Sequence, residues 1–327
     1  MSRSSRALAL LALPALLVAG CSSGAAPAGG SDDAAVEALA SFYPLQLVTE
    51  QVGGDRVAVT SLTPPGAEPH DVELSPAQVA SVSAAQLVVY QSGFQAAVDE
   101  AVEQSAPAHV VDATDVADLQ VTGADDGHDH GAEDEHADEE HAEDEHEHAE
   151  EEHAEGELDP HFWLDPSRMP AVAQAVADAL AEVDPDGAAT YQANADELAD
   201  RFTALDEAYA AGLATCERTT FVTSHEAFGY LALRYDLEQV GISGLDPEAE
   251  PSPARLREVG ELVEAEGVTT IFFETLVSPK VAETLAADLG VEAALLDPLE
   301  GLTDETQDYF SVAEANLDAL SVALSCS

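Results

Sequence analysis

Three histidines lie where predicted strands or helices meet loops, and each could offer an imidazole nitrogen to a divalent metal ion. His70 follows the strand-like run Val57–Leu62, and His225 follows the run Thr219–Thr223. His161 comes just before the helical middle of the chain. Ligands of open α/β sheets bind outside the carboxyl ends of the strands, so the positions of His70 and His225 favour a shared binding site.

Two carboxylates, Asp297 and Glu300, follow another strand-like run, Val291–Leu296. Three imidazoles and one carboxylate are donors that zinc accepts in tetrahedral geometry, whereas manganese prefers more oxygen ligands. If four protein groups fill the site, no position is left for a reacting water, which favours binding over catalysis. Each acid also has an ordinary interpretation, Asp297 as part of an Asp-Pro turn and Glu300 as a solvated loop acid.

Other residues near these positions give weaker signals. His109 is best explained as an ordinary surface histidine. Ser224 beside His225 suggests a hydrolase pair, but neighbours in an extended segment point to opposite faces. The pair Asp165-Pro166 predicts the start of a helix, with Asp165 as its N-cap. No Gly-rich phosphate loop or nucleophile elbow occurs in the sequence.

Residues 124–157 form an acidic, histidine-rich segment without Lys or Arg. Its like charges oppose a stable helix, so we expect it to be disordered without metal. Neutral imidazoles in a strongly negative field would attract divalent cations weakly, and a solvated linker is the alternative interpretation. The accessory weak metal ligands predicted here are His128, His130, His136, His141, His146, His148 and His153.

The charge of the whole chain excludes one class of partner. The formal net charge is −55, and without the 18 acids of residues 124–157 it would still be −37. Such a surface repels nucleic acid and concentrates cations. We therefore expect no nucleic-acid partner.

The first residues predict export and a lipid anchor. Arg3 and Arg6 precede an apolar run too short to span a bilayer, and Val18-Ala19-Gly20-Cys21 is typical of a bacterial lipobox. We expect residues 1–20 to be a lipoprotein signal peptide, with lipidation at Cys21. Residues 21–34 then predict a flexible tether. No later stretch is apolar enough to predict a transmembrane helix.

The two other cysteines, Cys216 and Cys326, form an even pair in a chain expected outside the cytoplasm. Such a pair is more often a disulfide than two free thiols. Their count and spacing exclude a redox or zinc site of the CxxC type.

Strand-like and helical patterns alternate in both halves of the chain, which predicts an α/β fold with parallel sheets. We expect an N-terminal lobe over residues 35–184 and a C-terminal lobe over residues 215–327. Residues 185–214 predict a linking helix about 40 Å long, which could hold two lobes at a fixed distance.

Several motifs resemble those of the zinc-binding lipoproteins of ABC transporters, the ZnuA/AdcA type of the TroA-like metal-binding proteins. The resemblance covers about residues 36–326, and a His-rich acidic loop before the third motif is also typical of the zinc members. The motifs are Ala38-Leu39-Ala40-Ser41-Phe42-Tyr43-Pro44, Pro65-Gly66-Ala67-Glu68-Pro69-His70-Asp71, Asp159-Pro160-His161-Phe162-Trp163-Leu164-Asp165-Pro166, Val222-Thr223-Ser224-His225-Glu226-Ala227-Phe228-Gly229-Tyr230 and Asp297-Pro298-Leu299-Glu300-Gly301-Leu302.

The resemblance implies two α/β lobes joined by a long rigid helix, with one ion in the cleft between them. It implies the ligands His70, His161 and His225, and zinc is favoured because manganese members usually carry a carboxylate where His225 stands. For the fourth ligand it favours Glu300, with Asp297 as the alternative. Some zinc members bind through the three histidines alone, and such a variant would here depend on Glu68 or water.

The resemblance further implies a monomeric, lipid-anchored receptor outside the cytoplasm that delivers Zn²⁺ to an ABC permease with its ATPase. Such a receptor is not an enzyme. The alternatives are a zinc buffer or chaperone, and a metal-dependent surface adhesin. A metallohydrolase is the weakest alternative, because it requires a zinc-bound water near a general base.

Overall fold

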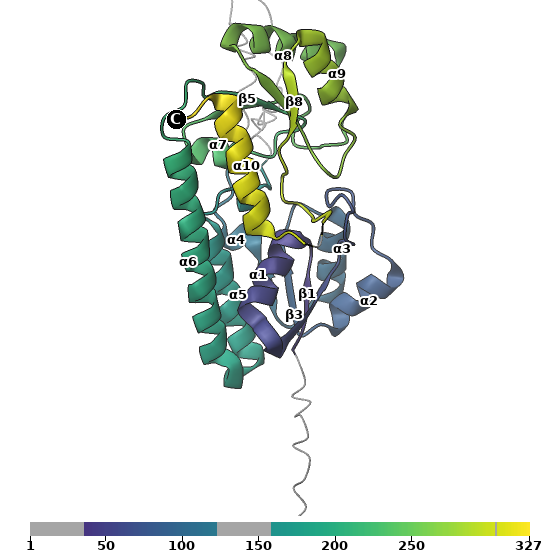
Figure 1. Ribbon diagram of the computed structural model, residues 1–327. Coiled ribbons are helices and arrows are strands. Elements are labelled where there is room, and N and C mark those ends of the chain that lie inside the picture. The colour runs from purple at the N-terminus through teal and green to yellow at the C-terminus, as the bar shows by residue number, and fades with distance from the viewer. Residues whose placement is uncertain (1–35, 123–157, 305) are drawn as a thin grey trace, which may run out of the picture. The chain divides into compact units, whose positions relative to one another are not determined.

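Two parallel four-stranded sheets organise the protein, as seen in a computed structural model that describes residues 36–122, 158–304 and 306–327. Within the compact unit Ala35–Ser327, each sheet carries helices (Figure 1). The predicted α/β fold with parallel sheets is therefore confirmed. The predicted signal peptide, the tether with Cys21 and the seven histidines of residues 124–157 lie outside the described residues.

The N-terminal sheet has the strand order β2-β1-β3-β4. Both of its faces are buried, because successive residues of β1 enter different cores: Ala38 and Ala40 pack toward α1 and α5, and Leu39 packs toward α2 and α3. Continuous apolar strands of this kind are typical of parallel sheets covered on both sides. Its strands are β1 (Val36–Ala40), β2 (Val57–Ser61), β3 (Leu87–Tyr90) and β4 (Val110–Asp112).

The C-terminal sheet repeats this plan with the order β6-β5-β7-β8. Val222 and Ile271 face a core shared with α8 and α9, whereas Phe221 and Phe272 face the core that includes α10. Its strands are β5 (Thr220–Thr223), β6 (Glu238–Gly241), β7 (Thr270–Phe273) and β8 (Glu292–Leu295).

The helices cover both sheets, and their starts follow ordinary capping chemistry. Ser75 and Ser252 cap α2 and α8, and each is followed by Pro in the first turn. The helices are α1 (Tyr43–Gly53), α2 (Pro76–Ala84), α3 (Ala96–Ser105), α4 (Ala113–Val116), α5 (Met169–Val183), α6 (Ala188–Gly212), α7 (Gly229–Arg234), α8 (Pro253–Glu266), α9 (Lys280–Leu289) and α10 (Tyr309–Leu324).

The predicted long helix is α6, which has 25 residues and is therefore about 38 Å long. It runs beside α5 and also reaches α10 (Figure 1). Phe202 packs against Phe310 at a centroid distance of 5.1 Å, and the Tyr209 hydroxyl donates to the carbonyl of Ala313 at 2.6 Å. These contacts fix α6 against elements of both halves. The division at residues 184/185 and 214/215 stays a prediction.

A disulfide joins Cys216 and Cys326, so the residues after α6 are linked to the C-terminal end.

Among the helices in the described ranges, none combines the length and apolarity needed to cross a membrane.

The predicted helix start at Asp165-Pro166 is wrong, because α5 begins four residues later at Met169. The Asp165 carboxylate does not cap a helix; it accepts hydrogen bonds from the N–H and hydroxyl of Ser167 and from Arg168. The proline in the first turn of α5 is Pro170. An Asp-Pro pair therefore makes a turn here rather than a helix cap.

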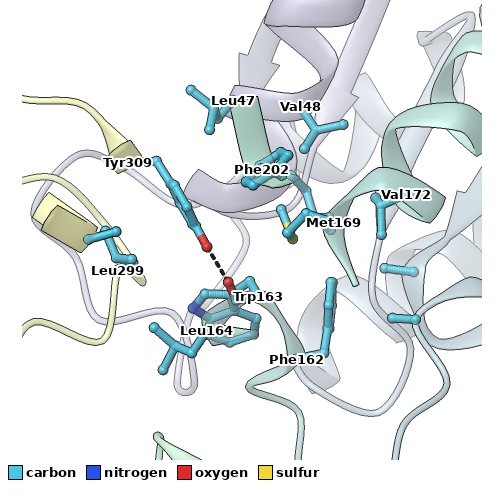
Figure 2. Packing of buried hydrophobic residues seen from close by; sticks show 14 of the residues in the cluster. Leu47, Val48, Phe162, Trp163, Leu164, Met169, Val172, Phe202, Leu299 and Tyr309 are labelled. Carbon is cyan, nitrogen blue, oxygen red and sulfur yellow. Dashed lines mark hydrogen bonds between the residues drawn. The ribbon is translucent and has the colours of Figure 1, made fainter. Parts of the chain in front are cut away.

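A buried aromatic cluster lies between the start of α5, α6 and α10. Trp163 is fully buried, and its ring packs against Phe42 at a centroid distance of 4.8 Å. The Tyr309 hydroxyl at the start of α10 donates to the carbonyl of Trp163 (Figure 2). Trp163 thus packs against Phe42 in the loop between β1 and α1, and its carbonyl accepts a hydrogen bond from the start of α10.

Candidate metal site

Four side chains from loops distant in sequence point their ligand atoms at one position. His70 follows β2, His161 precedes a 3₁₀ turn, His225 follows β5 and Glu300 follows β8. Of the described residues, these form the one cluster of three or more potential metal ligands with mutually close donor atoms. The structure therefore brings together the four residues that the sequence analysis favoured as ligands.

The distances among the four donor atoms fit a tetrahedral zinc site. His161 Nε2 lies 3.2 Å from His70 Nε2 and 3.3 Å from His225 Nε2. Oε1 of Glu300 lies 3.3 Å from His70 Nε2 and 3.4 Å from the Nε2 atoms of His161 and His225. A tetrahedron with zinc–ligand bonds of about 2.0–2.1 Å has edges of about 3.3–3.4 Å. These five of the six donor–donor distances therefore match the edges of a zinc tetrahedron, and all four donor atoms lie within 4.8 Å of one another.

Burial divides the cluster into an inner and an outer part. The side chains of His161 and His225 are 0% exposed and that of Glu300 is 2% exposed, whereas that of His70 is 13% exposed. The site therefore opens to solvent on the side of His70.

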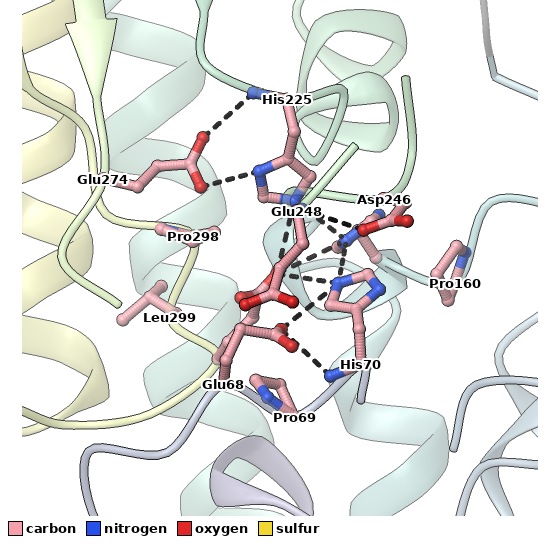
Figure 3. A network of polar contacts seen from close by, with 12 residues as sticks. Glu68, Pro69, His70, Pro160, His225, Asp246, Glu248, Glu274, Pro298 and Leu299 are labelled. Carbon is pink, nitrogen blue, oxygen red and sulfur yellow. Dashed lines mark hydrogen bonds and ion pairs between the residues drawn. The ribbon is translucent and has the colours of Figure 1, made fainter. Parts of the chain in front are cut away.

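Two buried carboxylates orient the inner histidines. Asp159 accepts from Nδ1 of His161 at 2.7 Å. Glu274 accepts from Nδ1 of His225 at 2.6 Å (Figure 3). Each carboxylate also accepts from the backbone N–H of the same histidine. A proton held on Nδ1 leaves the Nε2 lone pair free for a metal.

Other buried side chains hold the backbone near three of the ligands, His70, His161 and Glu300. Gln95 donates to the carbonyl of Pro69, Gln91 donates to the carbonyl of Pro160, and Trp163 donates to the carbonyl of Pro298. Sequence reasoning missed these supports, together with Asp159 and Glu274. They act across the fold, and only their position inside or beside the quoted motifs could have indicated some of them.

Asp297, the alternative fourth ligand, lies outside the cluster. Its Oδ1 accepts from the N–H of Leu299 at 2.8 Å, and its Oδ2 accepts from the Thr275 hydroxyl at 3.0 Å. Leu299 has a positive φ of 60°, so the chain turns sharply just before Glu300. Asp297 shapes the turn that presents Glu300.

Glu68, Ser224 and His109, which were also considered from the sequence, do not belong to the ligand cluster. Glu68 accepts from the N–H groups of His70 and Asp71, and its Oε1 lies 4.0 Å from His70 Nε2. The Ser224 hydroxyl donates to the carbonyl of Phe272, so it forms no pair with the histidine next to it. His109 lies beside Glu182 at 3.5 Å and does not belong to the cluster.

In the metal-free cluster, nearby charges and hydrogen bonds raise the pKa values of His161 and His225 and lower that of Glu300. Burial by itself lowers the pKa of His225, but the negative charges of Glu274 and Glu300 overcome this and raise it to about 10. Burial also lowers the pKa of His161 by itself, but Asp159 and Glu300 together outweigh this effect and raise it. Burial by itself raises the pKa of Glu300, but hydrogen bonds from the three histidines lower it well below its usual value.

Metal binding should therefore release protons. A raised pKa of His225 stabilises the metal-free fold fully below the unfolded value of about 6.5, and this contribution is lost as the pH rises through about 10. Zinc at Nε2 must displace that proton, so we expect release of at least about one proton per zinc near pH 7.5. Calorimetric titrations in buffers of different ionisation enthalpy measure this number, and a value of zero would contradict the prediction.

The orienting role of Glu274 leads to a second prediction. In Glu274→Gln, an amide N–H must face either the backbone N–H or Nδ1 of His225, and the second arrangement moves the ring proton toward Nε2. We expect zinc affinity to fall by about 10- to 100-fold. Glu238→Gln is the matched control, because Glu238 is an exposed acid in the same half. Equal affinities of the two variants in chelator competition would argue against an orienting role.

Two parallel sheets, a long connecting helix and a buried site of three histidines and one glutamate define a two-lobed metal-binding protein. Residues 39–323 match the model of the ZnuA family, described as zinc-uptake complex component A periplasmic. The chain therefore belongs to the ZnuA family. The resemblance inferred from the motifs is confirmed.

Relatives of this chain agree with that assignment. It is 38% identical to the zinc-binding lipoprotein AdcA of Streptococcus pneumoniae over 96% of this chain and 60% of AdcA, so it spans less than two thirds of that relative. It is 36% identical to the high-affinity zinc uptake system protein ZnuA of Bacillus subtilis, over 94% of each chain. The crystal structure of the Zn(II)-bound ZnuA-like domain of S. pneumoniae AdcA matches with a TM-score of 0.69 and 34% identity, over 89% of this chain and 99% of that domain.

Proposed function

We propose that this protein is a receptor outside the cytoplasm that captures Zn²⁺ as a substrate and delivers it to an ABC permease with its ATPase. The observation that carries the proposal is the set of five donor-atom distances of 3.2–3.4 Å that connect His70, His161, His225 and Glu300. The proposed ligands are these four residues. The relatives named as zinc-binding and zinc-uptake proteins support zinc as the ion.

Binding without catalysis follows from the same ligand set. Four protein ligands complete a tetrahedral zinc shell, so no position is left for an activated water. The side chains of His161, His225 and Glu300 are almost fully buried, which also keeps water from the inner part of the site. We therefore infer that the protein is not an enzyme.

Delivery requires that the bound ion can leave. The helix α6 contacts both halves, because Asn194 donates to the carbonyl of Val52 and Tyr209 donates to the carbonyl of Ala313. It should therefore limit a wide hinge motion. We infer that release begins with a local rearrangement of the loops near His161 and His225. A large rotation of one sheet relative to the other between metal-free and zinc-bound crystals would contradict this.

The predicted lipid anchor at Cys21 completes the proposal, because it would keep a monomeric receptor at the cell membrane beside its permease. The lipoprotein name of the AdcA relative supports the anchor. Two tests separate the alternatives. A zinc buffer or chaperone would lack neighbouring permease and ATPase genes, and an adhesin would bind a host matrix in a zinc-dependent assay.

The first experiment measures zinc stoichiometry and affinity by chelator competition, with Mn²⁺ in parallel. The protein lacks the predicted signal peptide, and a short Gly/Ser linker replaces residues 124–157. This replacement is compatible with the fold, because the N–H of Asp159 donates to the carbonyl of Gln120 at 3.0 Å across the junction. One tight zinc site with weak manganese binding would support the receptor. Loss of tight binding would mean that residues 124–157 bind the metal.

A further inference from the structure

The carboxylate that orients His161 has a hydrogen-bond partner for each oxygen. Oδ1 of Asp159 accepts from the backbone N–H and from Nδ1 of His161, at 2.8 and 2.7 Å. Oδ2 accepts from the hydroxyl of Thr122. Asp159 is 0% exposed, so its Oδ2 depends on a protein hydrogen-bond donor instead of water. Among the described residues, the Thr122 hydroxyl is that donor. The Thr122 hydroxyl fixes the plane of the carboxylate that holds the imidazole.

The C-terminal half closes over the same carboxylate. A Cβ added at Gly229 would lie 2.8 Å from Oδ2 of Asp159 and 2.6 Å from Cβ of Thr122, so the close approach requires a glycine. Next to it, the buried Tyr230 hydroxyl accepts from the N–H of Gln120 at 2.6 Å and donates to the carbonyl of Asp159 at 2.9 Å. Both residues begin α7 (Gly229–Arg234).

These contacts link two of the proposed zinc ligands. Gly229 follows His225 by four positions, so the segment that carries His225 also contacts the carboxylate that orients His161. Nε2 of His225 lies 3.3 Å from Nε2 of His161. A shift of Asp159 would change this separation, because the His161 backbone and ring are both held by its Oδ1.

We infer that Thr122 is a positioning residue for zinc binding, acting through Asp159 on His161, and that Gly229 and Tyr230 hold this pair against the C-terminal half. The inference rests on the proposed function, because it concerns the same metal site. This role requires a side-chain hydroxyl that donates a hydrogen bond to Oδ2 of Asp159. Without it, a buried carboxylate oxygen lacks a partner, and the carboxylate is free to turn away from Nδ1 of His161.

The test compares Thr122→Val, Thr122→Ser and the control Thr114→Val in the full-length mature protein. Thr114 is also partly buried in the N-terminal half, and its hydroxyl donates to the carbonyl of Ser92. We expect Thr122→Val to bind zinc about tenfold more weakly, the lower end of the range for residues that support a ligand, and Thr122→Ser to stay within about threefold of wild type. The absorption spectrum of the Co²⁺-loaded protein should change in Thr122→Val alone.

Two results would overturn the inference. Either Thr122→Val binds zinc as tightly as Thr114→Val, or Thr122→Ser fails to rescue the loss. Thermal melting of the metal-free variants identifies any general folding defect. If Thr122→Val has such a defect, Tyr230→Phe tests the inference instead, because it removes the hydroxyl between Gln120 and Asp159. Tyr230→Phe must then weaken zinc binding by itself. Failure of the proposed function is distinguishable, because the wild-type protein would then lack a tight zinc site.

Discussion

Replacing His225 by alanine should weaken zinc binding by about two to three orders of magnitude. Tetrahedral zinc sites contribute roughly 10–16 kcal/mol, or about 3–4 kcal/mol per ligand, and each 1.4 kcal/mol is about tenfold. The Glu274 carboxylate accepts one hydrogen bond from Nδ1 of His225 and one from the backbone N–H of His225. The substitution removes the first and keeps the second, and a buried carboxylate that loses its imidazole partner adds to the loss.

Chelator competition measures this loss, with His109→Ala as the matched control. His109 is the same residue type, but its side chain is 34% exposed and lies outside the cluster. His109→Ala should therefore bind zinc as the wild type does. If His225→Ala kept its tight site while replacement of residues 124–157 abolished it, the cluster would not be the zinc site.

Much of the cluster was predictable because each parallel α/β sheet directs the loops after its strands to one edge. His70 follows β2 of the N-terminal sheet, and His225 and Glu300 follow β5 and β8 of the C-terminal sheet, so strand ends indicated these three positions as ligand positions. The alternation of strand-like and helical patterns predicted the α/β fold, because such alternation is typical of parallel sheets covered by helices. The strand Val57–Ser61 was recognisable from local pattern as the strand-like run Val57–Leu62.

The supports of the ligands were not predictable from local pattern, because their partners are distant in sequence. Glu274 lies 49 residues from His225, and no periodicity connects them. The choice between Glu300 and Asp297 depended on a turn geometry in which Asp297 accepts from Leu299 N–H. The sequence motifs include Asp159, Asp297 and Leu299 without revealing their roles, and Glu274 lies outside all of the motifs.

The largest effect on folding is expected from Trp163→Ala. Trp163 is fully buried, packs against Phe42 and Phe94, and lies 5.2 Å from the ring of His161 between centroids. Loss of a buried indole should lower the free energy of unfolding by about 3–5 kcal/mol. Zinc affinity should fall as well, because Nε1 of Trp163 donates to the carbonyl of Pro298, two residues before Glu300.

Urea denaturation of the metal-free protein, followed by circular dichroism, measures this loss without depending on the fluorescence of the chain's single Trp. Val322→Ala, at a side chain that is 77% exposed, should leave stability unchanged. Trp163→Phe separates packing from hydrogen bonding, because it keeps an aromatic ring and removes the donor to Pro298. We expect it to lose only about 1–3 kcal/mol. If Trp163→Phe bound zinc normally, the indole would act through packing alone, and the hydrogen bond to Pro298 would not position Glu300.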